Sequence, residues 1–168
     1  DVSIDKIAGI MEIPTGTVKS HLSRGKEKLA VFLKQNGYYV NRHSCFLLQY
    51  HLVLVTKYRH PVIRGQLETA LRNYTETYFK DRDLAIQAFE CMPDHIHILF
   101  DAKPNLNLAE FVNAFKSASS RNIRKQFSEE LKPYYWKPYF WSLSYFIGTV
   151  SDRTSTAVKE YIKNQKNE

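Results

Sequence analysis

The chain has 168 residues, of which 43% are hydrophobic and 14% aromatic, so it can bury a core, and disorder throughout the chain is excluded. Lysine and arginine number 24 against 17 acidic residues, which gives a formal charge of +7 and favours a polyanionic partner, either nucleic acid or an anionic membrane surface. No apolar run approaches the roughly 18 residues that cross a bilayer, so we expect a soluble, intracellular protein.

The composition of the chain changes near Gly37, which predicts two domains, residues 1–37 and residues 38–168. The first contains six basic and four acidic residues and the second 18 and 13, so both carry an excess of positive charge. We therefore expect the larger part of the basic surface in the second domain.

Two helical patterns separated by Pro14 make up the first domain. The later pattern begins around Thr15 to Thr17 and is expected to turn Val18, Leu22, Leu29 and Leu33 inward. Two short helices joined by a tight turn are typical of a helix-turn-helix, whose second helix enters the major groove of duplex DNA. The residues of this helix that are placed to contact duplex DNA are Lys19, Ser20 and Arg24. The segment SIDKIAGIMEIPTGTVKSHLSRGKEKL resembles the last part of region 4 of bacterial sigma factors of the extracytoplasmic-function type, and it is either a working DNA-binding element or a passive relic of a gene fusion.

The second domain alternates between strand and helix patterns. Stretches rich in β-branched and aromatic residues predict strands at 45–56, 84–91, 95–101 and 140–150, and apolar residues at helical spacing predict helices at 67–82, 108–127 and 155–165. This order, β-α-β-β-α-β-α, is that of a ferredoxin-like or RRM-like fold with one extra helix. We therefore predict an α+β protein: an antiparallel sheet with helices on one face and a C-terminal tyrosine-bearing helix, preceded by a short helix-turn-helix-like segment. The two cysteines, Cys45 and Cys91, form no CxxC pair and are expected to be buried thiols.

Two histidines, His95 and His97, alternate with apolar residues in the third predicted strand. Side chains on a strand alternate between faces, so both imidazoles are expected on one face, while Ile96, Ile98 and Phe100 point into the core. Two imidazoles at this spacing can share a metal ion, or they can form a hydrogen-bonded or solvated pair on an open sheet face. The spacing alone leaves both interpretations open.

The last predicted helix carries Tyr161 and Gln165 at positions i and i+4. They share one face of that helix, so a nucleophilic hydroxyl and an amide oxygen can approach the same point. They can equally be surface residues of an amphipathic terminal helix. Neither this motif nor the pair of histidines decides the question by itself.

Together, and in this order, the motifs resemble a specific family. From about Arg42 to Gln165 the chain is similar to the single-tyrosine HUH transposases of the insertion sequence family 200/605, the TnpA type. The segments that carry the resemblance are NRHSCFLLQYHLVLVTKYRHPV, MPDHIHILF, FVNAFKSASSRNIRKQF, YFWSLSYFIGTV and VKEYIKNQ. The resemblance implies that His95 and His97 are ligands of a Mg²⁺ or Mn²⁺ ion, with Gln165 as the third protein ligand. It implies that Tyr161 is the nucleophile.

The chemistry that the resemblance implies is transposition of single-stranded DNA at the ends of an insertion sequence, with recognition of subterminal hairpins. A divalent ion offsets charge on the phosphate, and attack by the tyrosine gives a covalent 5′-phosphotyrosine and a free 3′-hydroxyl. Because the bond energy is kept in the phosphotyrosine, strands can be rejoined by reversal without ATP. The resemblance also implies a homodimer with composite active sites, in the cytoplasm of a bacterium and at its nucleoid DNA.

Basic residues of the second domain fit a DNA-binding surface, although each can equally belong to a solvated face. They are Lys57, Arg59, Lys116, Arg121, Arg124 and Lys125. The spacing of Arg121, Arg124 and Lys125, at i, i+3 and i+4, predicts that these three share one helix face. The aromatic cluster between Tyr134 and Trp141 can stack bases, but so dense a group usually fills a core. The linker at 150–156 lacks the glycine pair that commonly precedes the tyrosine helix in the family as a hinge.

Two alternatives to an active transposase are carried forward. One is a sequence-specific DNA-binding regulator that uses the N-terminal helix-turn-helix and has an inert HUH domain. The other is a non-catalytic RNA-binding module, since ferredoxin-like sheets often present aromatic side chains to RNA, but the chain lacks the RNP aromatic strand signature.

Overall fold

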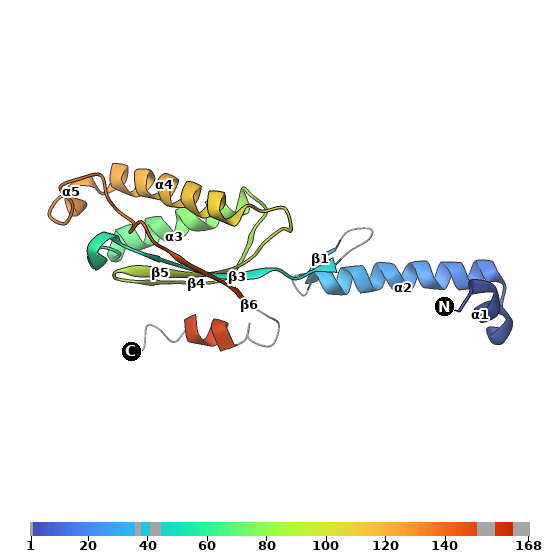
Figure 1. The fold of residues 1–168 in the computed structure, drawn as a ribbon. Coiled ribbons are helices and arrows are strands. Elements are labelled where there is room, and N and C mark those ends of the chain that lie inside the picture. The colour runs from blue at the N-terminus through green and yellow to red at the C-terminus, as the bar shows by residue number, and fades with distance from the viewer. Residues whose placement is uncertain (1, 36–37, 41–44, 151–156, 163–168) are drawn as a thin grey trace. The chain divides into compact units, whose positions relative to one another are not determined.

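The computed structural model of the chain describes residues 2–35, 38–40, 45–150 and 157–162 (Figure 1). They belong to two compact units, Asp1–Leu47 and Leu48–Glu168. The compact units divide later in the chain than the change in composition near residue 37, because a short hairpin belongs to the first unit. No helix in the described ranges combines the length and the apolar character that crossing a membrane requires.

The first unit begins with two helices joined by a tight turn, as predicted. Its elements are α1 (Ile4–Met11), α2 (Thr15–Gln35) and a hairpin of β1 (Tyr39–Val40) and β2 (Cys45–Phe46). Ser3 caps α1, because its hydroxyl accepts a hydrogen bond of 3.3 Å from the backbone N–H of Lys6. Glu12, in the left-handed conformation at a φ of 52°, ends the helix and turns the chain toward α2.

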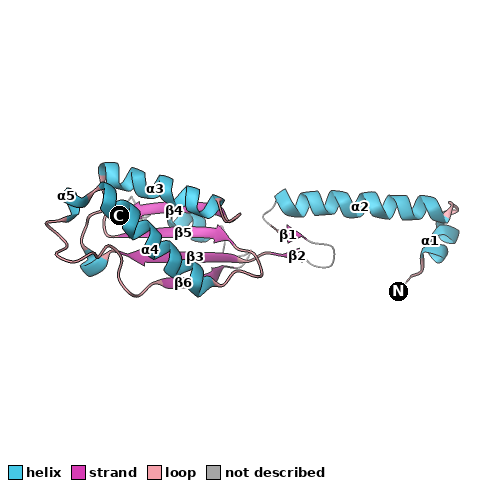
Figure 2. Ribbon diagram, turned by 90° about the horizontal axis from the view of Figure 1, so that it is seen from above, coloured by secondary structure: helices cyan, strands magenta, loops and turns pink. Residues whose placement is uncertain are grey.

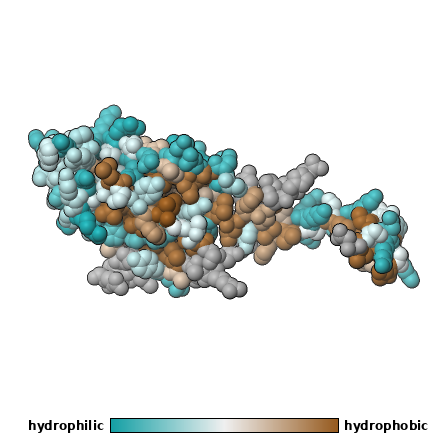
Figure 3. Space-filling model, viewed as in Figure 1, coloured by the Kyte–Doolittle hydropathy of each residue, from teal (hydrophilic) through white to brown (hydrophobic). Residues whose placement is uncertain are grey.

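Most of α2 is more exposed than its apolar pattern predicts. The buried side chain of α1 is Ala8 and that of α2 is Val18. Leu22 and Leu29 are 43% and 55% exposed, so the prediction that they turn inward is wrong. The reason is length: α2 has 21 residues and α1 only eight, so α1 covers only part of α2. Apolar side chains accordingly reach the surface of this unit in Figure 3.

The second unit is built on a four-stranded antiparallel sheet with the strand order β4-β5-β3-β6. Its strands are β3 (Gln49–Val55), β4 (Ala85–Met92), β5 (His95–Asp101) and β6 (Phe146–Val150). Two long helices, α3 (Gly65–Lys80) and α4 (Leu108–Gln126), lie over one face, and the helical residues 157–162 lie on the other (Figures 1 and 2). The predicted α+β fold, an antiparallel sheet with helices packed on it, is confirmed.

Alternate side chains of the two central strands form the core beneath α3 and α4. Leu52 of β3 is fully buried there, as are Ile96 and Ile98 of β5. Phe100 continues this row, and its ring meets the ring of Phe79 edge-to-face at a centroid distance of 5.2 Å. The predicted alternation of β5 is therefore confirmed on its core side.

Replacing the fully buried Phe100 by alanine is expected to lower the free energy of unfolding by about 3–5 kcal/mol. The substitution removes apolar area and leaves a cavity beside Phe79, which the close-packed helices can fill only in part. Leu143→Ala is the matched control, since that side chain is 87% exposed and its loss should cost within about 0.5 kcal/mol. Urea unfolding followed by circular dichroism measures both, and equal midpoints for the two variants would contradict the assigned core.

Two predicted strands are shorter in the structure. The strand predicted at 45–56 divides after Phe46, because β2 pairs with β1 whereas β3 joins the sheet. The strand predicted at 140–150 is reduced to β6, since the indole N–H of Trp141 donates a 2.9 Å hydrogen bond to the buried Ser119 hydroxyl and holds this stretch against α4. The structure adds two short helices that were not predicted, η1 (Lys57–Arg59) and α5 (Ser128–Leu131).

Both cysteines are free thiols. Cys91, in β4, is buried as predicted. Cys45 is exposed, so the prediction is wrong there, because its strand belongs to a two-stranded hairpin and not to the sheet.

Candidate active site

The strand β5 places His95 and His97 on the sheet face opposite α3 and α4. A tight turn at Pro93 and Asp94 connects β4 to β5, so His95 begins the strand immediately after the turn. The two imidazole centroids lie 5.0 Å apart, with the rings at 73° to each other. On the same face, two residues further along β5, Leu99 packs in a separate small apolar cluster. The sequence pattern therefore brings the two rings together on one face.

The ring of His95 is held by the carboxylate of the preceding residue. Its Nδ1 lies 2.6 Å from Oδ1 of Asp94, and the other carboxylate oxygen of Asp94 accepts a 2.9 Å hydrogen bond from Nε of Arg59. Burial raises the pKa of Asp94, but the hydrogen bond and charge of His95 and the charge of Arg59 together lower it below its usual value. An ionised Asp94 is an acceptor for the Nδ1–H of His95, which orients the ring and leaves Nε2 as the nitrogen that does not face Asp94.

The ring of His97 is more deeply buried and is held by a third histidine. Its Nδ1 lies 2.9 Å from Nε2 of His51, on β3, and the two rings stack with centroids 5.1 Å apart and planes at 18°. Nε2 of His97 is buried and has no hydrogen-bond partner among the described residues. Burial, helped by the neighbouring His51 and His95, lowers the pKa of His97 to about 4, and burial lowers the pKa of His51. His97 is therefore a neutral imidazole at neutral pH, and its Nε2 has no hydrogen-bond partner in the described part of the chain.

His51 was not identified from the sequence as part of this site. Alternation along β3 puts it on the face opposite Leu52, but the sequence does not fix the pairing of β3 with β5. In the structure His51 stands across from Leu99 and Val53 across from His97, so His51 and His97 are diagonal neighbours. The signal available in the sequence was a histidine followed at strand spacing by the apolar Val53 and Val55.

Stability is expected to depend on pH through His97. An unfolded histidine titrates near 6.5, whereas His97 in the folded protein titrates near 4, so between these values the unfolded chain binds a proton that the folded one does not. The free energy of unfolding should keep the whole contribution of His97 above pH 6.5 and should fall as the pH is lowered toward 4. Urea titrations with a chelator present measure the slope, which should be smaller in His97→Phe. The same slope in both proteins would contradict the assigned environment of His97.

The ring of Tyr161 lies next to that of His97. The two centroids are 5.9 Å apart and the planes are at 85°, so the rings meet edge-to-face within one chain. Tyr161 is 53% exposed, whereas its neighbour Ile162 is buried against Leu99 and Val150. The buried Ile162 anchors the helical residues 157–162 on the sheet and leaves the side chain of Tyr161 about half-exposed.

The described residues offer two imidazoles that fit a divalent metal ion. No group of three His, Cys, Asp or Glu side chains in the described ranges is arranged to hold a metal. The unpartnered, buried Nε2 of His97 is the kind of atom that a metal would satisfy. Gln165, predicted as a third ligand, lies outside the described residues, as does most of the linker that lacks glycine.

The basic residues predicted to bind DNA fall into two groups. Lys116 and Arg124, on α4, are partly buried and bind backbone carbonyls: Lys116 Nζ donates to the carbonyl of Leu143 at 2.6 Å and Arg124 Nη1 to that of Tyr139 at 2.7 Å. Burial lowers the pKa of Lys116. Arg121 and Lys125, on the same helix, are exposed, so the three-residue basic face predicted from spacing is only partly available to a ligand.

The other two predicted basic residues follow β3. Lys57 is partly buried, with its ammonium 4.9 Å from the ring centroid of Tyr58 and 5.3 Å from that of Tyr139. Arg59 is exposed but is paired with Asp94, so it supports His95 indirectly.

The aromatic cluster that was predicted either to pack or to stack bases divides into buried and exposed rings. Tyr135, Phe140 and Trp141 belong to the core, and burial raises the pKa of Tyr135 to about 12. Trp136 is 78% exposed and is the most open aromatic ring of the group.

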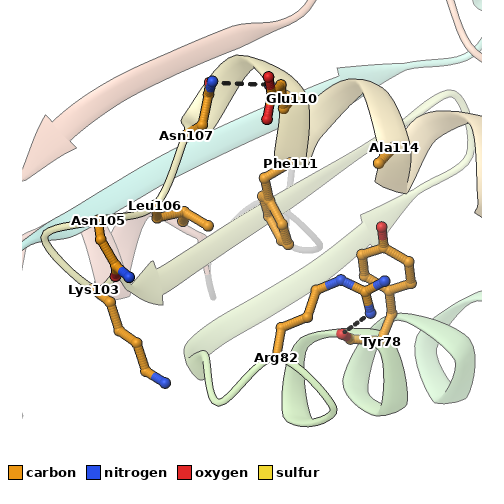
Figure 4. Close-up of a pocket in the computed structure, with 9 residues that line it drawn as sticks. All are labelled: Tyr78, Arg82, Lys103, Asn105, Leu106, Asn107, Glu110, Phe111 and Ala114. Carbon is orange, nitrogen blue, oxygen red and sulfur yellow. Dashed lines mark hydrogen bonds between the residues drawn. The ribbon is translucent and has the colours of Figure 1, made fainter.

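A pocket of about 520 Å³ lies away from the histidines, between the end of α3, the loop after β5 and the start of α4 (Figure 4). In it the guanidinium of Arg82 lies 3.5 Å from the ring centroid of Tyr78 and also binds the carbonyl of Tyr78. Asn107 caps α4 by accepting a hydrogen bond from the backbone N–H of Glu110. None of the residues predicted to bind DNA lines this pocket.

The residues predicted to contact duplex DNA lie in the first half of α2. Lys19 and Arg24 are exposed, and the hydroxyl of Ser20 donates to the carbonyl of Thr17 at 2.9 Å. Two of the three predicted contacts, Lys19 and Arg24, are therefore exposed cations on this helix of the first unit.

Two known proteins are similar to about three quarters of this chain. The ISDra2 transposase TnpA of Deinococcus radiodurans is 35% identical over 124 residues, which cover 74% of this chain and 88% of that protein. The transposase for insertion sequence element IS200 of Salmonella typhimurium is 30% identical over 126 residues, covering 75% of this chain and 82% of that protein.

Two solved structures of transposases are also similar to this chain. A crystal structure of a Deinococcus radiodurans protein described as a transposase superposes with a TM-score of 0.62 at 34% identity, covering 76% of this chain and 97% of that one. The structure of a REP-associated tyrosine transposase bound to a REP hairpin shares the fold, with a TM-score of 0.51 at 16% identity and coverage of 77% and 73%. The family described as "Transposase IS200 like" matches residues 44–165. The chain therefore belongs to the family of IS200-like transposases.

Proposed function

We propose that this chain cleaves and rejoins single-stranded DNA at insertion-sequence ends through a covalent 5′-phosphotyrosine at Tyr161. The observation that carries the proposal is the contact between the rings of Tyr161 and His97, with the Nε2 of His97 buried and without a partner among the described residues. A half-exposed hydroxyl beside two imidazoles on one sheet face combines a nucleophile with groups able to hold a cation.

In the proposed reaction the phenolic oxygen of Tyr161 attacks a phosphorus atom of the DNA backbone. A bond forms between that oxygen and phosphorus, the bond from phosphorus to the 3′-oxygen breaks, the tyrosine gives up its proton, and the leaving oxygen takes one up. The products are a 5′-phosphotyrosine and a free 3′-hydroxyl, and attack by a 3′-hydroxyl reverses the reaction without ATP.

A Mg²⁺ or Mn²⁺ ion is part of the proposal, with His95 and His97 as its described ligands and Gln165 as the third. Such an ion would neutralise charge that develops on the phosphate. The carboxylate of Asp94 and the ring of His51 orient the two imidazoles, because each lies within hydrogen-bond distance of one ring Nδ1 and leaves Nε2 to face a cation.

Hairpin recognition by the second unit rests on its exposed basic and aromatic side chains. Arg121, Lys125 and Trp136 are exposed, so they can contact phosphates and stack a base. The fold is shared with the tyrosine transposase whose structure contains a REP hairpin, which supports this part of the proposal.

The experiment that tests the proposed function incubates the protein with a labelled single strand that carries an insertion-sequence end hairpin. With Mg²⁺ or Mn²⁺ present, we expect a protein–DNA adduct that survives denaturing electrophoresis, and none with EDTA. Cleavage that leaves 5′-phosphate ends and no adduct would identify a hydrolase and overturn the proposal.

The resemblance implies a homodimer with composite active sites, and we keep this as part of the proposal. In the structure, the ring of Tyr161 contacts the ring of His97 of the same chain. Mixing Tyr161→Phe protein with His97→Ala protein tests the composite arrangement, because only an exchange of tyrosine helices restores an intact site. Failure of the mixture to form adduct would overturn composite sites and leave the cleavage chemistry in place.

The alternative, a duplex-binding regulator, is favoured by one observation: α1 and α2 form a helix-turn-helix arrangement with exposed Lys19 and Arg24. In that case the double variant Lys19→Ala/Arg24→Ala should weaken duplex binding and lower its salt dependence, and Lys34→Ala, at the far end of α2, should not. If the double variant and Lys34→Ala bound duplex DNA equally well, the regulator would be contradicted and the transposase would remain the supported function.

A further inference from the structure

We propose that His51 is a positioning residue that fixes the proton on Nδ1 of His97 and so directs the lone pair of Nε2 toward the bound cation. This inference rests on the proposed function, because it concerns how one proposed metal ligand is held. It assigns a role to a residue 46 positions away in sequence from the histidine that it contacts.

The contact between the two rings is specific. Nε2 of His51 and Nδ1 of His97 are 2.9 Å apart, and the rings stack with their planes at 18°. On its other side the ring of His51 meets the edge of the Phe146 ring at a centroid distance of 6.1 Å. The ring of His97 is also flanked by His95 and Tyr161, so few orientations are open to it.

The direction of this hydrogen bond decides what Nε2 of His97 can do. One of the two facing nitrogens must donate, and a neutral imidazole carries only one N–H. If Nδ1 of His97 donates, Nε2 carries a lone pair that a metal can use. If His51 donates instead, Nε2 of His97 carries a hydrogen that is buried without a partner among the described residues and points where a cation should bind. A ligand role for His97 therefore requires His51 to be the acceptor and to carry its own proton on Nδ1.

The two proposed ligands are held in the same manner by different acceptors. Asp94, an anion, accepts at Nδ1 of His95, and His51, a neutral ring, accepts at Nδ1 of His97. Metal-bound histidines are generally held by such a second hydrogen bond, which sets both tautomer and ring orientation. If His51 only stacked on His97, its contribution would not depend on an acceptor atom. Removing that atom therefore distinguishes ring stacking from hydrogen bonding.

The tautomers can be read directly in the metal-free wild-type protein. Long-range ¹H–¹⁵N correlation spectra of the imidazoles at neutral pH are expected to show the Nδ1–H form for both His51 and His97. An Nε2–H form of His97, or a mixture of the two tautomers, would overturn the inference. This measurement uses no variant, so it does not depend on whether a substituted protein folds.

Mn²⁺ affinity, measured by electron paramagnetic resonance, gives the second readout. His51→Phe keeps an aromatic ring against His97 but removes the acceptor, and it should weaken Mn²⁺ binding by roughly 10–100-fold. His51→Gln places an amide oxygen near the position of the lost nitrogen and should recover most of that loss. His21→Phe, on the exposed face of α2, is the matched control and should bind Mn²⁺ as the wild type does.

The outcomes separate this inference from the proposed function. If the wild type binds Mn²⁺ and His51→Phe binds it equally well, His51 only fills space and the inference fails, while the proposed function stands. If His51→Gln is as weak as His51→Phe although both fold, the acceptor atom is not what matters, and the inference fails again. If the wild type takes up no Mn²⁺, the proposed function fails and the inference fails with it.

Discussion

Replacing Tyr161 by phenylalanine is expected to reduce formation of the protein–DNA adduct by roughly 10⁴-fold or more, because the variant has no oxygen to attack phosphorus. The substitution removes one hydroxyl and keeps the aromatic ring, so the edge-to-face contact with His97 remains. The side chain is half-exposed, and the free energy of unfolding should change by no more than about 0.5 kcal/mol. The adduct is measured by denaturing electrophoresis of labelled DNA.

Tyr74→Phe is the matched control, since Tyr74 lies on α3, which covers the opposite face of the sheet. It should form the adduct at the wild-type rate. Adduct that persists in Tyr161→Phe would show that another side chain is the nucleophile. Adduct lost in both variants would point to damage to the fold and would be seen as a lower unfolding midpoint.

Replacing His97 by alanine is expected to have the second-largest effect on activity, at least about 100-fold on adduct formation. Partners that merely orient a metal ligand are already worth about 10–100-fold, and the ligand itself should be worth more. Mn²⁺ binding should fall in parallel, which distinguishes loss of the ligand from loss of DNA binding. Affinity for the hairpin strand, measured with EDTA present, should stay near the wild-type value.

His21→Ala serves as the control for this histidine, because His21 is exposed on α2 of the other unit. It should retain both Mn²⁺ binding and adduct formation. Wild-type activity in His97→Ala would remove the main support for metal-assisted cleavage on this strand.

The part of the site that could be predicted is the part encoded locally. The alternation of His95 and His97 with Ile96 and Ile98 places the two rings together whatever the strand's neighbours are, because the period of a strand is two. The bounds of β5 in the structure, His95–Asp101, agree with the predicted strand. The contact between Tyr161 and His97 could not be derived from spacing, since it depends on how the terminal helix packs, and only the family resemblance pointed to it.

Residues whose role depends on distant pairing were missed or misjudged. His51 needs the register between β3 and β5, which no short pattern specifies. Arg124 has the helical spacing of a basic face with Arg121 and Lys125, yet it and Lys116 turn to carbonyls of the stretch 139–143, whose position follows from the packing of Trp141 on α4. Leu22 and Leu29 follow a correct helical period, but a period identifies an apolar face and not the surface that would cover it.

The position of β5 in the middle of the sheet, with Ile162 as the buried anchor of the tyrosine segment, gives the two halves of the site different local stabilities. Amides of β5 pair with strands on both sides, and one face of the strand packs on the main core, so they should exchange with solvent only when the whole unit opens. Residues 157–162 rest on the sheet mainly through Ile162 and the partly buried Val158, so they should detach at a much smaller free-energy cost. Once joined to DNA, Tyr161 would thus sit on an element that can leave the sheet while the imidazoles keep their places.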